Sequence, residues 1–132
     1  MGQKIKQFED LVAWQKARAL TATIYKTTAQ GSFVKDYTLT DQIRRAAVSV
    51  MPNVAEGFER RGAAEFARFV LIAKASCAEL RSQLYIALDV GYISEKLFSE
   101  LSTQAIEVAR ILGGLHASLL RDRDQSSPAK RR

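Results

Sequence analysis

The 132-residue sequence contains one cysteine, one histidine, two prolines and seven glycines, and each shortage excludes a class of protein. The single cysteine, Cys77, cannot form a disulfide within the chain, which excludes a disulfide-stabilised scaffold. The low proline and glycine content argues against a disordered or collagen-like chain. No apolar run approaches the ~20 residues that a membrane-spanning helix requires.

The beginning of the sequence lacks the pattern of a secretion signal. Lys4 and Lys6 are followed by Glu9 and Asp10, where a signal peptide would continue with an apolar segment. The lone cysteine is also typical of a reducing compartment. We therefore expect a cytoplasmic protein.

Catalytic and metal-binding motifs are also scarce. The only histidine, His116, and Cys77 could in principle form a nucleophilic pair, but a cysteine among apolar residues of a helix usually acts as a small hydrophobic residue. The sequence has no E-x-x-H pair of the kind that binds iron in helical bundles, and no glycine-rich phosphate-binding loop. We predict a protein with no enzymatic activity, no metal and no cofactor.

What the sequence does contain is helical periodicity. Apolar residues recur three and four positions apart in four segments, at about 9–29, 40–60, 63–90 and 94–120, with Thr40 and Ser94 as expected N-caps. Short breaks at Gly31, Gly62 and Gly91 separate the segments, and no alternating strand pattern is present. The sequence predicts an all-α protein, an up-down-up-down antiparallel four-helix bundle over residues 9–120.

The net charge of +6 is concentrated in the two ends of the chain. Residues 1–8 carry a charge of +2 and residues 121–132 carry +3. We predict a basic N-terminal arm over 1–8 and a basic, disordered tail over 121–132. Such ends either keep a protein soluble or attract a polyanion such as nucleic acid.

The second predicted helix is apolar over more than half of its circumference. One stripe contains Ile43, Ala46, Ala47, Val50, Val54 and Phe58. Val48, Met51 and Ala55 widen this stripe beyond what one buried face of a four-helix bundle needs. We therefore predict that these three residues contact another subunit.

The opposite side of that helix is polar. Pro52 lies there with Arg45, Ser49 and Glu56, where a proline bends the helix without reaching the core. Arg44, which borders the apolar arc, can serve either the interface or a ligand. Arg60 and Arg61 end the helix, and this arginine-rich face is either a solvated surface or a phosphate-binding one.

Two further features allow two interpretations each. Trp14, Phe66 and Phe69 could stack on nucleic-acid bases, but their positions on apolar stripes favour packing in the core. Gly113 and Gly114 lie inside the fourth helix, where glycine is unfavourable, so we expect a close helix approach or a local break there.

Several blocks of the sequence resemble a known family. LVAWQKA, LTDQIRRAAVSV, NVAEGFERR and the long segment EFARFVLIAKASCAELRSQLYIALDVGYI occur in order, and they resemble the four-helix bundle proteins encoded in intervening sequences of 23S ribosomal RNA genes. IEVARILGGL also resembles the accessory variability protein of diversity-generating retroelements. The resemblance implies a four-helix subunit that assembles into a pentameric ring, binds nucleic acid and has no enzymatic activity.

We therefore expect a homo-oligomer, a pentamer, that binds RNA or DNA mainly through phosphate contacts, or that assists a ribonucleoprotein or another nucleic-acid-processing protein. The alternative is a protein-protein scaffold with no nucleic-acid role; clustered arginines would favour the first function and scattered ones the second. The candidate nucleic-acid-binding residues are Arg44, Arg45, Arg60, Arg61, Arg68, Arg121, Arg123, Lys130, Arg131 and Arg132, with Lys4 and Lys6 in the N-terminal arm.

Overall fold

A computed structural model describes residues 4–126 of the chain, and side chains as far as residue 124. Within this range it contains four α-helices, two short 3-10 helices and no strand. The helices are α1 (Val12–Thr28), α2 (Tyr37–Glu59), α3 (Ala63–Asp89) and α4 (Glu95–Ser126), and the 3-10 helices are η1 (Phe8–Asp10) and η2 (Gly31–Lys35).

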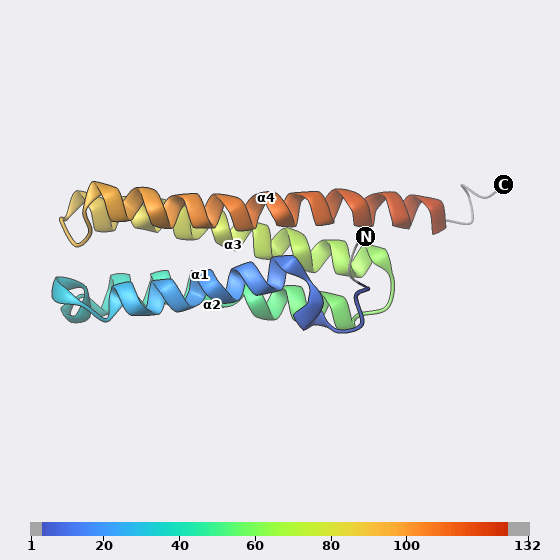
Figure 1. The fold of residues 1–132 in the computed structure, drawn as a ribbon, viewed down its shortest axis with the longest axis horizontal. Coiled ribbons are helices and arrows are strands. Elements are labelled where there is room, and N and C mark those ends of the chain that lie inside the picture. The colour runs from blue at the N-terminus through green and yellow to red at the C-terminus, as the bar shows by residue number, and fades with distance from the viewer. Residues whose placement is uncertain (1–3, 127–132) are drawn as a thin grey trace.

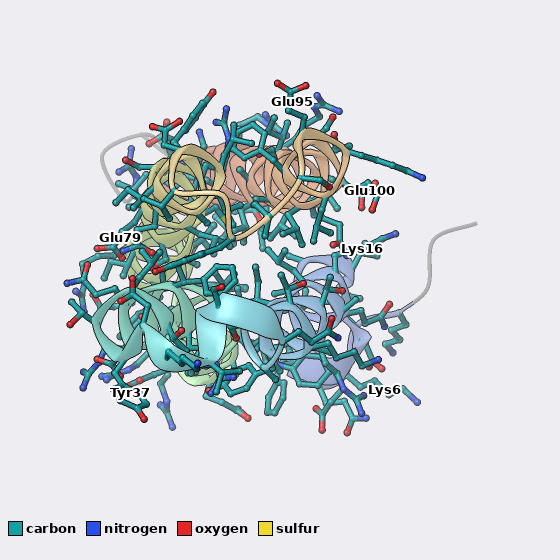
Figure 2. The ribbon with its side chains drawn as sticks, turned by 90° about the vertical axis from the view of Figure 1, so that its left-hand side faces the viewer. Lys6, Lys16, Tyr37, Glu79, Glu95 and Glu100 are labelled. Carbon is teal, nitrogen blue, oxygen red and sulfur yellow. The ribbon has the colours of Figure 1, made fainter. Side chains whose placement is uncertain are left out.

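The four helices form an up-down-up-down bundle (Figure 1). Each helix runs antiparallel to the next, α3 packs along both α2 and α4, and α1 closes the bundle against the other sides of α2 and α4. Viewed end-on, the four helices surround one core (Figure 2). The predicted all-α four-helix fold is confirmed. No helix in residues 4–126 combines the length and the apolar character needed to span a membrane.

The core consists of the apolar stripes that the periodicity predicts. In α2, the stripe residues Ile43, Val50 and Val54 are completely buried. Burial of each such side chain contributes about 1.5–3 kcal/mol, which is what makes the stripe a strong determinant of helix orientation. The other large side chains that are fully buried include Leu20, Ile24, Val70, Leu80, Leu84, Leu101, Val108 and Leu112.

The start of α2 differs from the prediction. The helix begins at Tyr37, and Asp36 caps it by accepting a hydrogen bond from the Leu39 amide at 3.0 Å. Thr40, the predicted cap, instead donates its hydroxyl to the Phe33 carbonyl at 2.8 Å. The second Asp36 oxygen accepts a hydrogen bond from the Tyr92 hydroxyl at 2.9 Å, and this bond raises the pKa of Tyr92. One carboxylate thus joins the α1–α2 turn to the α3–α4 turn.

The fourth helix is longer and more regular than predicted. It continues to Ser126, six residues into the segment assigned to the tail, and residues 127–132 lie outside the described part of the chain. The expected break or close approach at the glycine pair is wrong. A Cβ at Gly114 would meet nothing within 4 Å, and one at Gly113 would meet only the end of Lys74 at 3.6 Å.

The close approach occurs at a different glycine, Gly57 in α2. A Cβ built on this buried residue would lie 2.7 Å from the Cβ of Phe69 and 2.9 Å from the Cδ1 of Phe66, both in α3. Any side chain larger than hydrogen would therefore push α2 and α3 apart. Next to this contact, Gly62 begins the turn into α3 with φ of 91°, a conformation that other residues rarely adopt.

We expect Gly57→Ala to lower the free energy of unfolding by about 1–3 kcal/mol, because the added methyl group overpacks the α2–α3 contact. Gly114→Ala is the matched control, and it should raise that free energy by about 0.5–1 kcal/mol because alanine favours the helix and the site is open. Urea unfolding followed by circular dichroism measures both. Equal effects of the two substitutions would contradict the assigned role of Gly57.

Candidate nucleic-acid interface

Most of the predicted cationic residues within the described chain gather at one end of the bundle. Figure 1 places the N-terminus, the α2–α3 turn and the C-terminal part of α4 at this end. We call it the basic end and define it by seven residues: Lys4, Lys6, Arg60, Arg61, Arg68, Arg121 and Arg123. Lys130, Arg131 and Arg132 lie outside the described residues.

Arg44 and Arg45 are not part of the basic end. They lie about 24 Å away along α2, since sixteen residues separate Arg44 from Arg60 and an α-helix rises 1.5 Å per residue. The Arg45 Nε donates a hydrogen bond to Asp41 Oδ2 at 2.8 Å, and both side chains are largely exposed. Arg45 is therefore a solvated residue of the α2 surface.

Arg44 is bound within its own subunit. Its Nε donates a hydrogen bond to the hydroxyl of the buried Thr28 at 2.8 Å, and its guanidinium carbon lies 4.5 Å from the centre of the Tyr25 ring. Both partners belong to α1. Arg44 thus ties α2 to α1 through its Nε and through the stacking of its guanidinium group on Tyr25.

Carboxylates accompany the arginines of the basic end. Arg60 Nη2 lies 2.8 Å from Glu56 Oε1, Arg68 Nε lies 3.1 Å from Glu65 Oε2, and Arg123 pairs with Asp124 at 3.0 Å. Hydrogen bonding and charge attraction by Arg68 lower the pKa of Glu65. Exposed pairs of this kind contribute only ~0–1 kcal/mol, so a phosphate can compete for these arginines.

The charge of the basic end is balanced within the described residues. Its seven cations are matched by seven carboxylates in the same segments: Glu9, Asp10, Glu56, Glu59, Glu65, Asp122 and Asp124. The described residues of this end therefore carry no excess positive charge, and the three further cations of the C-terminal segment, at 130–132, lie outside the described chain. Direct contacts, more than a strong local field, must determine where an anion binds.

Phe69 holds two of these arginines in place. The guanidinium carbons of Arg60 and Arg68 lie 5.1 Å and 4.7 Å from the centre of its ring. Such contacts contribute about 0.5–1 kcal/mol at exposed sites, and they fix the planar guanidinium groups relative to the α2–α3 turn. Phe69 itself is buried, which confirms that it packs in the core and does not offer a free face to bases.

The other two aromatic candidates are also packed. Phe66 meets Phe58 edge-to-face, with ring centres 5.9 Å apart, and Trp14 meets Phe8 at 5.3 Å. Both are half-buried against the core. The packing interpretation of the aromatic residues is therefore confirmed.

Two predicted arginines remain free of partners within the described chain. Arg61 and Arg121 are exposed, and neither forms a hydrogen bond or ion pair with residues 4–126. They can contact a phosphate without breaking an existing pair. This distinguishes them from Arg60, Arg68 and Arg123, which are each paired with a carboxylate.

The comparison with known families bears on what this end does. Residues 9–114 match the model of a family described as 23S rRNA-intervening sequence protein. The chain belongs to this family. A crystal structure of a protein of unknown function from the S23 ribosomal protein family of Bacteroides thetaiotaomicron has the same fold, with a TM-score of 0.73 and 20% identity. The similarity covers 80% of this chain and 98% of that one. No protein with a curated description is significantly similar in sequence.

The three residues predicted at the oligomer interface differ in exposure. Val48 is 39% exposed and lies on the outer side of α2 with Pro52, whereas Met51 and Ala55 are half-buried and Met51 packs against the core of its own subunit. Ser49, which the sequence placed on the polar outer side, instead shares a hydrogen bond of 2.7 Å with Ser76 of α3. Part of the wide apolar arc is therefore used within the subunit.

Cys77 lies in α3, on the side of the helix that faces the core. It is completely buried, and burial raises the pKa of its thiol to about 11. The thiol is therefore protonated at neutral pH, which makes it a poor nucleophile. No group of three or more potential metal ligands occurs among residues 4–126.

We expect Cys77→Ala to lower the free energy of unfolding by about 1 kcal/mol, because it removes one buried sulfur atom and leaves a small cavity. The variant should keep the helical content and any nucleic-acid affinity of the wild type. Chemical unfolding and a binding titration test this. Loss of a measurable catalytic activity in a folded variant would contradict the structural role.

Proposed function

We propose that this protein is a non-enzymatic, oligomeric helical bundle of the cytoplasm that binds RNA or DNA mainly through phosphates, directly or as the accessory of a ribonucleoprotein. One observation carries the proposal: Arg61 and Arg121, which have no partner among residues 4–126, lie at the same end of the bundle as Arg60 and Arg68, which stack on Phe69. Fixed guanidinium groups beside free ones suit contacts to a chain of phosphates.

The charge of the whole chain supports the same function. Each subunit carries a net charge of +6, so a ring of five would carry about +30 and attract a polyanion even through weak individual contacts. No base-reading motif is present in the sequence, so we expect little sequence preference. The family description links the proteins to the 23S rRNA context, which agrees with a nucleic-acid role.

The oligomer that we propose is a homopentamer with Val48, Met51 and Ala55 at the contact between subunits. If the long axes of the subunits run along the axis of the ring, every subunit presents its basic end on the same rim. Repetition at fixed spacing would then compensate for the balanced charge of the single subunit.

We expect Val48→Asp to dissociate the oligomer while the subunit stays folded, because this side chain is exposed in the single bundle. Val50→Asp should unfold the protein, since it places a carboxylate in the core. Light scattering at micromolar concentration gives the mass, and circular dichroism gives the helical content. A wild-type mass of 14.7 kDa would refute the oligomer.

For nucleic-acid binding, we expect an anisotropy titration to detect association with an unstructured RNA or DNA oligonucleotide at 50 mM salt. The affinity should fall steeply towards 200 mM salt, because binding releases counterions from the nucleic acid. Arg61→Gln should weaken binding severalfold. Arg45→Gln, which removes the same charge from an exposed arginine outside the basic end, is the matched control and should have little effect.

Two further variants compare the α2–α3 turn with the C-terminal end of the chain. Removing residues 122–132, which include the last residues of α4 with Arg123, takes away a net charge of +2, whereas changing Arg60 and Arg61 to Glu lowers the charge by 4 at the α2–α3 turn, so the second change should weaken binding more. No binding to single- or double-stranded RNA or DNA at tens of micromolar protein would instead favour the scaffold function. The local balance of charge at the basic end is the observation that favours this alternative.

A further inference from the structure

Arg81 in α3 is a half-buried arginine that has no partner. Its Nε is buried without a hydrogen-bond acceptor, and the side chain forms no hydrogen bond, ion pair or ring contact with any of residues 4–126. No carboxylate lies three or four positions from it in α3, in contrast to Arg45, Arg60 and Arg68. A buried donor without an acceptor costs free energy, and a ligand that supplies the acceptor removes this cost.

A second unpaired group lies level with Arg81 in α4. The rings of Tyr85 and Phe98 are in contact, with centres 4.7 Å apart, and this contact fixes the register of the antiparallel helices α3 and α4. Arg81, four residues before Tyr85, is therefore level with Ser102, four residues after Phe98. The Ser102 hydroxyl is also buried without a hydrogen-bond partner. Two unsatisfied polar groups thus occur at one level of the contact between α3 and α4.

Lys74 adds a second cation on the same side of α3. It is exposed, it lies two turns before Arg81, and its ammonium is 3.6 Å from the Cβ position of Gly113 in α4. It forms no ion pair within the described chain. We call this surface the α3–α4 seam and define it by five residues: Lys74, Arg81, Tyr85, Phe98 and Ser102. From Lys74 to Tyr85 the seam extends about 16 Å along α3, since an α-helix rises 1.5 Å per residue.

The neighbouring carboxylates of α3 and α4 point away from the seam. Within residues 66–88 the only carboxylate is Glu79, which borders a depression together with residues of α2. Glu107 of α4 lies 3.5 Å from Lys16 of α1. Figure 2 shows Glu79 on the α2 side of α3 and Glu100 on the α1 side of α4. The two cations of the seam are therefore not neutralised, which distinguishes the seam from the basic end.

Tyr85 gives the seam an exposed aromatic ring. The contact with the half-buried Phe98 holds the ring, and yet 53% of Tyr85 remains exposed. Exposed aromatic rings next to cations are the surfaces on which unpaired bases stack in proteins that bind single strands. Glu95, in the first turn of α4, lies one turn beyond Phe98. This carboxylate disfavours a phosphate at the aromatic end of the seam but does not repel a neutral base.

We propose that the α3–α4 seam binds a segment of single-stranded nucleic acid, with phosphates at Lys74 and Arg81 and a base stacked on Tyr85. This inference rests on the proposed function and adds that the bound strand is unpaired, because a base within a duplex has no free face for Tyr85. A phosphate at Arg81 supplies the acceptor that the guanidinium group lacks in the free subunit. Stacking of this kind is tolerant of sequence, in agreement with the absence of a base-reading motif.

The seam continues from the basic end. Arg68, which belongs to the basic end, lies six residues before Lys74, or about 9 Å along α3. Figure 1 shows α3 and α4 running side by side from the basic end along the bundle. A strand held by phosphates at the basic end therefore reaches the seam directly. A single strand is flexible enough to follow the two helices, whereas a duplex is stiff over this length.

The stacking on Tyr85 is tested by titrating the full chain with a single strand and with a blunt duplex of the same length at 50 mM salt. Tyr85→Ala should weaken binding of the single strand at least fivefold and leave the affinity for the duplex unchanged. Tyr85→Phe keeps the ring and should bind like the wild type. Circular dichroism shows whether each variant keeps the helical content of the wild type.

The matched control is Tyr37→Ala, which removes an exposed tyrosine at the start of α2. Figure 2 shows Tyr37 on the side of the bundle away from α3 and α4, so this variant should bind both nucleic acids like the wild type. Equal effects of Tyr85→Ala and Tyr37→Ala on the single strand would overturn the proposal. An equal loss of single-strand and duplex binding in Tyr85→Ala would also overturn it.

The salt dependence provides an independent readout of the phosphate contacts. Arg81→Gln should weaken single-strand binding severalfold and reduce the slope of log affinity against log salt by about one, whereas Arg45→Gln should change neither. Binding that depends on Arg61 but not on Arg81 or Tyr85 would refute the seam and leave the proposed function intact. Absence of any binding by the wild type would refute both.

Discussion

The close approach of α2 and α3 at Gly57 is the constraint on which the rest of the structure depends. Because no side chain stands between the helices there, Phe69 can pack beneath the end of α2. The same packing brings Arg60, at the end of α2, and Arg68, in the second turn of α3, over one aromatic ring. The geometry of the basic end is therefore a consequence of a helix–helix contact in the core.

The periodicity of apolar residues was sufficient to predict the fold. The apolar residues that must be buried determine which side of each helix faces the core, and Ile43, Val50 and Val54 are completely buried as expected. The N-cap of α2 was harder to predict, because Asp36 and Thr40 are both good capping residues. Only the neighbouring α3–α4 turn, whose Tyr92 donates a hydrogen bond to Asp36, favours Asp36. The site of the close helix approach was predicted wrongly because it too depends on which elements are neighbours. Gly113 and Gly114 of α4 have no backbone or core atom beside them, whereas Gly57 contacts the neighbouring helix α3.

The candidate site was only partly predictable. The pairs of Arg45 with Asp41, Arg60 with Glu56 and Arg68 with Glu65 follow from spacings of three and four residues, so the sequence could have shown that these arginines are neutralised. The stacking on Phe69 and the binding of Arg44 by α1 could not be predicted, since both require knowledge of which helices are neighbours.

Binding of a polyanion at the basic end is tested most directly by its footprint on the folded protein. Backbone amide exchange, or amide NMR shifts, can be compared with and without a short single-stranded RNA at 50 mM salt. We predict changes in residues 4–10, 57–68 and 118–126, and none in residues 37–48. Changes centred on residues 37–48, or no change at all, would contradict the account.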